Sequence, residues 1–78
     1  MSELSPLVIH MAFVSSCVES AARAENTSYI DMYHRMKKVG LVQAYLRELD
    51  PVHTQSREYV TNEVIQTLHE LESKGITL

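Results

Sequence analysis

The sequence predicts an all-α fold: a compact bundle of four helices, two long and two short, around one layer-packed core. Three observations support this prediction. Apolar residues recur at spacings of three and four in four stretches of the chain, which is typical of helices. Serines precede several of these stretches and glycines follow two of them, as at helix starts and ends. The 78 residues include only two Gly, two Pro and no Trp, which disfavours a turn-rich β architecture.

The length predicts a single helical domain over 1–78, with an ordered core at about 6–75. A chain of this size buries only about 60% of the surface that its unfolded form exposes. Self-association is therefore a reasonable way to bury more apolar surface. The hydrophobic content of 45% and charged content of 22% are ordinary for a soluble protein.

The first helix is expected to begin at Ser5-Pro6, where Ser caps and Pro suits the first helical position, and to end near Glu25. It is apolar over much of its girth, which predicts either a central position or a contact with a partner. Its main apolar seam consists of Leu7, Met11, Val14, Val18 and Ala21, and its second stripe of Ile9, Phe13 and Cys17.

Two short helices are expected next. The first follows Ser28 and runs to about Val39, with Gly40 as its stop. The second covers residues 41–49 and ends at Asp50-Pro51, because a residue before Pro avoids the α region.

The second long helix lies between Ser56 and Lys74, and Gly75 closes it. Its apolar seam consists of Val60, Val64, Leu68 and Leu71, with Ile65 beside it.

The segment DPVHTQSREY, at residues 50–59, is dense in reactive residue types but lacks the spacing of a catalytic motif. A domain this small also leaves little room for a substrate pocket. We therefore expect no enzyme, no catalytic residue and no small-molecule substrate. The segment is expected to build the corner before the last helix, with Tyr59 leading into the core and His53 the residue to test for a further role. The residues that form this corner are His53, Thr54, Gln55, Ser56 and Tyr59.

Neither a metal nor a cofactor is expected, because the four histidines lack the tight spacing of a structural zinc site. The single Cys17 cannot form an internal disulfide, which fits a reducing compartment, and its apolar neighbours predict a buried, inert thiol. The apolar run at 6–14 follows Glu3 rather than a basic residue and is interrupted by His10. It does not fit a signal peptide or a membrane span of about 20 residues, so we expect a cytoplasmic protein.

Two clusters are candidates for contacts with a partner. The first is a face rich in Met and Tyr, which a monomer core or a protein interface would each explain. It consists of Tyr29, Met32, Tyr33 and Met36. The second is the basic group His34, Arg35, Lys37 and Lys38, which suits a helix C-terminus, an acidic partner or DNA. The net charge of −3 argues against nucleic acid.

The run VHTQSREYV, followed by NEVIQTL, resembles the C-terminal signature L-H-T-Q-[SG]-x-x-Y of a small uncharacterised bacterial family, a domain of unknown function. Val52 stands where the family usually has Leu, and Asp50-Pro51 replaces a more ordinary helix end. The other positions that carry the resemblance are Phe13, Cys17, Val18 and Glu19, then Gly40, Tyr45 and Leu46, and finally Val60, Glu63 and Val64.

This resemblance implies a partner role, because members of the family look to be encoded beside proteins resembling ADP-ribosyltransferases, as a toxin is beside its neutralising partner. The predicted function is a small intracellular, non-enzymatic protein-binding module, antitoxin-like or homo-oligomeric. The alternative is a DNA-binding transcriptional regulator that uses the cluster around Arg35–Lys38. The family pattern also places an acid at Glu19, which we expect to pair with Arg57 or with the segment at His53 and Thr54.

Overall fold

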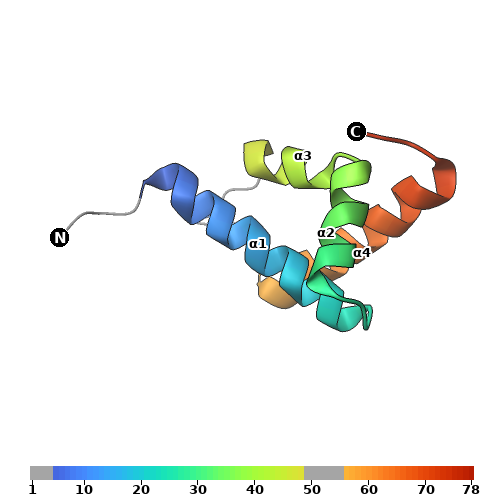
Figure 1. Cartoon of the computed structure of the whole chain (residues 1–78), viewed down its shortest axis with the longest axis horizontal. Coiled ribbons are helices and arrows are strands. Elements are labelled where there is room, and N and C mark those ends of the chain that lie inside the picture. Colours follow the sequence, from blue (N-terminus) through green and yellow to red (C-terminus); the bar gives the residue numbers. More distant parts are fainter. Residues whose placement is uncertain (1–4, 49–55) are drawn as a thin grey trace.

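The structure is a computed structural model that describes residues 5–48 and 56–78. It contains helices α1 (Pro6–Ala24), α2 (Tyr29–Lys38), α3 (Leu41–Glu48) and α4 (Arg57–Lys74), and the described residues contain no strand (Figure 1). The prediction of a compact all-α bundle with two long and two short helices is confirmed.

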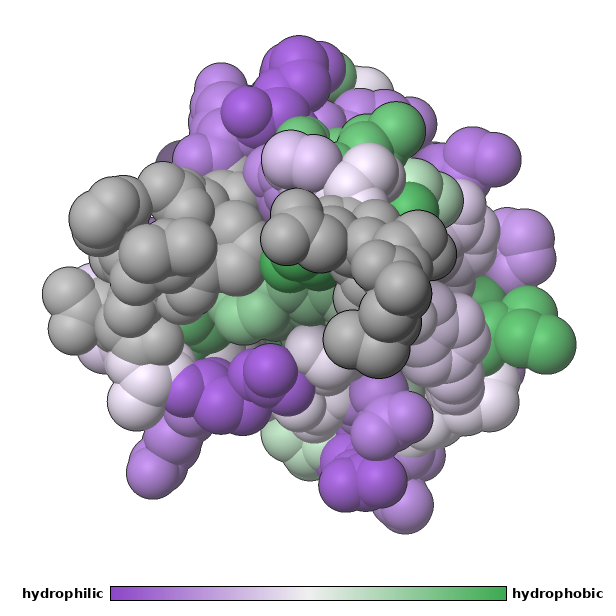
Figure 2. Space-filling model, turned by 90° about the vertical axis from the view of Figure 1, so that its left-hand side faces the viewer, coloured by the Kyte–Doolittle hydropathy of each residue, from purple (hydrophilic) through white to green (hydrophobic). Residues whose placement is uncertain are grey.

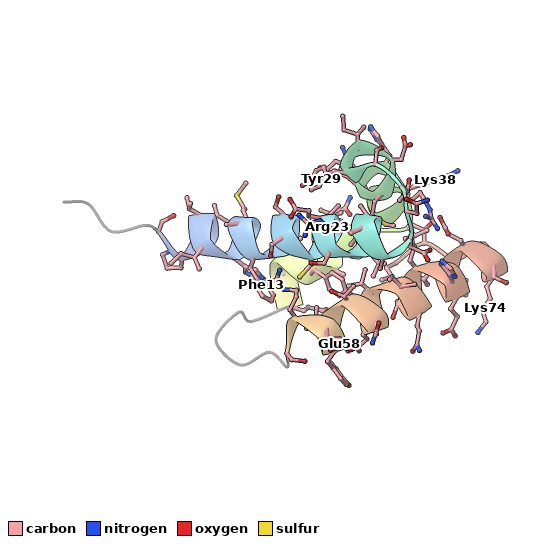
Figure 3. All side chains as sticks on the ribbon, turned by 90° about the horizontal axis from the view of Figure 1, so that it is seen from below. Phe13, Arg23, Tyr29, Lys38, Glu58 and Lys74 are labelled. Carbon is pink, nitrogen blue, oxygen red and sulfur yellow. The ribbon has the colours of Figure 1, made fainter. Side chains whose placement is uncertain are left out.

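Helix α1 is the central element, because α2, α3 and α4 all contact it, and α2 also contacts α3. Figure 3 shows α4 running beneath the C-terminal half of α1, with α2 on the opposite side. The core between them is formed mainly by aliphatic side chains and two methionines. Its largest fully buried side chains are Met32, Met36, Leu41, Leu68, Val18, Val64 and Cys17.

Serine caps start three of the helices, as the sequence predicts. Each serine hydroxyl accepts a hydrogen bond from the backbone N–H three residues later, which satisfies one of the unpaired donors of the first turn. The three bonds are Val8 N–H to Ser5 at 3.2 Å, Asp31 N–H to Ser28 at 3.1 Å and Tyr59 N–H to Ser56 at 3.2 Å.

The two glycines end helices in the left-handed region, with φ of 83° at Gly40 and 66° at Gly75. Gly40 also lies under the C-terminal segment of the chain. The Leu78 N–H donates to the Val39 carbonyl at 2.8 Å, and a Cβ added at Gly40 would lie 2.8 Å from the Leu78 carbonyl oxygen. The corner between α2 and α3 therefore requires glycine for both its backbone angle and the space above it.

The corner before α4 is described from Ser56 onward, so the predicted roles of His53, Thr54 and Gln55 lie outside the described residues. Val60, Val64, Leu68 and Leu71 are buried, which confirms the predicted seam of α4. Tyr59 is 55% exposed, so the expectation that it leads into the core is wrong. It lies one residue before the buried Val60, a rotation of about 100° around the helix axis.

Candidate protein-binding surface

The N-terminal half of α1 exposes its apolar side chains. Leu7 is 64% exposed, Val8 46%, Ile9 47% and Met11 52%. Figure 1 shows these first turns projecting beyond α2 and α4. Figure 2 faces the end of the molecule at which α1 begins, and hydrophobic residues reach the surface there. The apolar seam of α1 is therefore exposed at Leu7 and Met11 and buried from Val14 onward.

This exposure follows from where the neighbouring helices lie along α1 (Figure 1). Burial in α1 begins near its middle, and its buried residues are Val14, Cys17, Val18, Ala21 and Ala22. Near its start, α1 is tied to α3 by a hydrogen bond from His10 Nε2 to the backbone carbonyl of Tyr45, at 2.9 Å. Burial raises the pKa of this Tyr45 to about 12.

A groove continues the exposed surface along α1 toward α2 and α3. Its cavity volume is about 270 Å³. Its walls are mostly apolar and come from three helices. They consist of Met11, Val14, Ser15 and Val18 from α1, Tyr29 and Tyr33 from α2, and Val42 and Leu46 from α3. Met11 belongs to both the groove and the exposed half of α1, so the two form one surface.

Two tyrosines of α2 form the polar rim of the groove. The Tyr29 hydroxyl lies 2.9 Å from Ser15 Oγ, and Figure 3 shows Tyr29 reaching from α2 toward α1. The Tyr29 and Tyr33 rings stack with centroids 6.4 Å apart, and Lys37 Nζ lies 5.9 Å from the centre of the Tyr33 ring. Aromatic side chains with a polar tip are common at protein interfaces because they give contact area at little cost in conformational entropy.

The predicted Met- and Tyr-rich interface divides in the structure. Met32 and Met36 are fully buried, so the monomer core is the alternative that holds for them, and the interface alternative is wrong there. Tyr29 and Tyr33 instead line the groove. A spacing of four residues places both methionines on the face of α2 that packs against the core.

Sequence reasoning missed that Leu7, Val8, Ile9 and Met11 are exposed together. A signal for it was present, because Val8 and Ile9 lie off the main seam and make the first turns apolar over much of their girth. The groove residues Ser15, Val42 and Leu46 had no comparable signal.

The predicted pairing of Glu19 with Arg57 differs from the structure, and the alternative pairing with the segment at His53 and Thr54 lies outside the described residues. Glu19 Oε1 instead accepts a hydrogen bond from Arg23 at 3.0 Å, one turn along α1. The Arg57 guanidinium lies 5.5 Å from the centre of the Phe13 ring. This contact ties the start of α4 to α1 by a cation–π interaction.

The basic cluster at the end of α2 contributes to the fold. Arg35 donates two hydrogen bonds to the Glu72 carboxylate on α4, at 3.0 and 2.8 Å. These bonds hold the pKa of Glu72 below its usual value and raise the pKa of Arg35. Beside them, His69 Nε2 contacts the Glu25 carboxylate. The DNA-binding alternative stays a prediction. It would require Arg35 to contact DNA although its guanidinium is hydrogen-bonded to Glu72.

Cys17 is fully buried, as predicted, and burial raises the pKa of its thiol. A thiol in this setting is a poor nucleophile because little of it is thiolate at neutral pH. Over residues 5–48 and 56–78 the structure shows no group of three or more His, Cys, Asp or Glu placed to hold a metal ion.

Helix α1 is long and apolar enough to be a candidate membrane span by length and composition alone, and 28% of its most apolar window is buried inside the protein. A core helix of a water-soluble protein meets the same criterion, and the second half of α1 lies in the core.

The sequence profile of one protein family matches residues 12–70, which is most of the chain. The family is described as a protein of unknown function, DUF3791. The chain belongs to this family. Membership confirms the resemblance to a domain of unknown function, while the L-H-T-Q signature and the neighbouring ADP-ribosyltransferase-like proteins stay predictions. Curated proteins and solved structures gave no match.

Proposed function

We propose that the chain is a small, non-enzymatic, intracellular protein-binding module whose binding surface is the N-terminal half of α1 with the adjoining groove. The observation that carries this proposal is the exposure of Leu7, Val8, Ile9 and Met11 within two turns of one helix. Contiguous exposed apolar patches on small proteins mark interaction sites.

The groove supports the same function. It offers apolar walls, a rim of two tyrosines and the Ser15 hydroxyl, which together resemble the apolar centre and polar edge of protein interfaces. A helix or extended segment of a partner would lie along α1 and insert side chains between α1, α2 and α3.

The partner we propose is an ADP-ribosyltransferase-like protein that the chain neutralises. This part of the proposal rests on the family resemblance, and the small acidic helical chain with an exposed apolar surface suits it.

Co-expression tests this proposal. The tagged chain should retain the ADP-ribosyltransferase-like protein encoded beside it through purification, and the double variant Leu7→Ser, Met11→Ser should lose it. Ile30→Ser is the matched control, because Ile30 is 65% exposed on α2 but does not line the groove. Failure of the native chain to retain this protein, or equal retention by the double variant, would overturn the proposal.

A further inference from the structure

The exposed first half of α1 forms a ridge of apolar side chains, and the groove follows it along the same helix. The surface therefore has a ridge next to a hollow. Leu7 and Met11 fall on the groove side of α1, since they lie seven and three residues before the groove residue Val14. Two such surfaces turned by a two-fold rotation would each place a ridge over the other's groove. Self-complementarity of this kind is the requirement for an isologous dimer.

We propose that the occupant of this surface is a second copy of the same chain, with the two α1 helices antiparallel and crossing between Met11 and Ala12. This inference rests on the surface assigned under the proposed function and names the partner that fills it when the chain is alone.

At this crossing, each larger side chain of one copy packs against a smaller side chain of the other. An axis between Met11 and Ala12 sets Met11 opposite Ala12 of the second copy, and Val8 opposite Ser15. Val8, Met11, Ala12 and Ser15 are all exposed and lie along one side of α1, at spacings of three, one and three. Leu7 falls level with residue 16 of the second copy, beside the groove residues Ser15 and Val18.

The charges favour a second copy over a charged partner. The chain carries a net charge of −3, so two copies repel each other in general, but residues 5–18 contain no Asp, Glu, Lys or Arg. The contact region therefore adds no like-charge pair.

Glu19, the first charged residue after this stretch, falls level with residue 4 of the second copy, just before the Ser5 cap of its α1. No acidic residue occupies the first turn of α1, where the helix dipole favours negative charge. The pair that Glu19 forms with Arg23 is largely exposed, with side chains 58% and 80% accessible, so it holds Glu19 only weakly. The crossing thus supplies each helix start with a carboxylate from the other copy.

Sedimentation equilibrium of the purified full chain tests the dimer, with Met11→Glu, Met11→Lys and an equimolar mixture of the two. The native chain should have twice the mass of 8.9 kDa, each variant alone should have 8.9 kDa, and the mixture should regain the doubled mass. The rescue is expected because the crossing brings the two positions close, where opposite charges attract. Ile30→Glu, which places a charge on an exposed apolar residue outside the groove, should stay dimeric.

A native chain that is monomeric at high micromolar concentration would overturn the dimer. A native dimer that Met11→Glu leaves intact would also do so, as would a monomer that sediments with anionic phospholipid vesicles. If Met11→Glu lost its helical circular dichroism, Ala12→Glu and Ala12→Lys would give the same test, because Ala12 is exposed on the other side of the axis. A monomer that still captures the ADP-ribosyltransferase-like protein would remove the dimer and leave the proposed function standing.

Discussion

The first half of α1 is the more apolar by sequence, yet it is the less buried in the fold, because the surroundings of the two halves differ. Val18 is 1% exposed and belongs to the core cluster to which all four helices contribute, whereas Val8, ten residues earlier in the same helix, is 46% exposed. The difference shows that the apolar character of a helix face does not by itself decide its burial. Neighbouring helices decide it, and they bury side chains of α1 only from Val14 onward.

It follows that the two halves contribute to different free energies. Apolar side chains stabilise the fold in proportion to the surface that folding removes from water. The second half of α1 therefore stabilises the monomer. The first half retains apolar surface that only a second molecule can remove from water.

The largest effect on the free energy of unfolding is expected when Val is replaced by Glu once in each half of α1. Val18→Glu would bury an unpaired carboxylate, which we expect to cost more than about 4 kcal/mol and to leave a chain of this size unfolded. Far-UV circular dichroism should show the loss of helix.

Val8→Glu is the matched variant. It places Glu three residues after the Ser5 cap and completes a capping box, so the monomer should gain up to about 1 kcal/mol. Thermal unfolding at low concentration, where the chain is monomeric, measures this gain. Comparable losses in both variants would show that the two halves do not differ as the account requires.

Alanine variants of the two glycines test whether the contact with Leu78 constrains the corner between α2 and α3. Gly40→Ala combines a left-handed backbone angle with a contact of 2.8 Å to the Leu78 carbonyl, and should cost about 2–3 kcal/mol. Gly75→Ala has the same kind of angle and no atom within 4 Å, so it should cost only about 1 kcal/mol. Urea unfolding of both variants measures the difference, and equal losses would mean that the Leu78 contact does not constrain the corner.

The smallest effect on the free energy of unfolding is expected from the exposed ion pair between α2 and α4. Glu72→Gln breaks the bidentate pair with Arg35, whose side chains are both 35% exposed, and should cost about 1 kcal/mol or less at neutral pH. Because Arg35 lowers the pKa of Glu72 in the folded state, the contribution is present above the unfolded value of 4.5 and is lost as the pH falls through the folded pKa.

Acid titration of the unfolding free energy should therefore fall less steeply in Glu72→Gln than in the native chain. Glu70→Gln is the control, since Glu70 forms a more exposed pair with Lys74. Equal acid dependence in Glu72→Gln and the native chain would remove this role for the pair.

Much of the fold could be predicted because its determinants are local. Each serine cap acts on the third residue after it, and Gly75 adopts the angle that ends α4, so the helix boundaries follow from short stretches of sequence. The seam of α4 was also predictable, because the side of a helix with regularly spaced aliphatic residues faces the core.

The binding surface depended on distances that a sequence does not contain. Nothing local distinguishes Leu7 from Val14, because both lie on one seam, and only the positions of α2 and α4 decide which is covered. Met32 and Tyr33 are adjacent in the sequence, yet one enters the core and the other lines the groove. Glu19, expected to pair with Arg57 or with the segment at His53 and Thr54, contacts Arg23 one turn along α1, and this local spacing can be read from the sequence.

The most direct test of the division within α1 is the midpoint of urea unfolding as a function of chain concentration, for the native chain and for Met11→Glu. Association stabilises the folded state by mass action, so the native midpoint should rise with concentration. The midpoint of Met11→Glu should stay constant and equal the native value at the lowest concentration. A native midpoint that does not change with concentration would contradict the account. So would a Met11→Glu midpoint that lies below the native midpoint even at the lowest concentration.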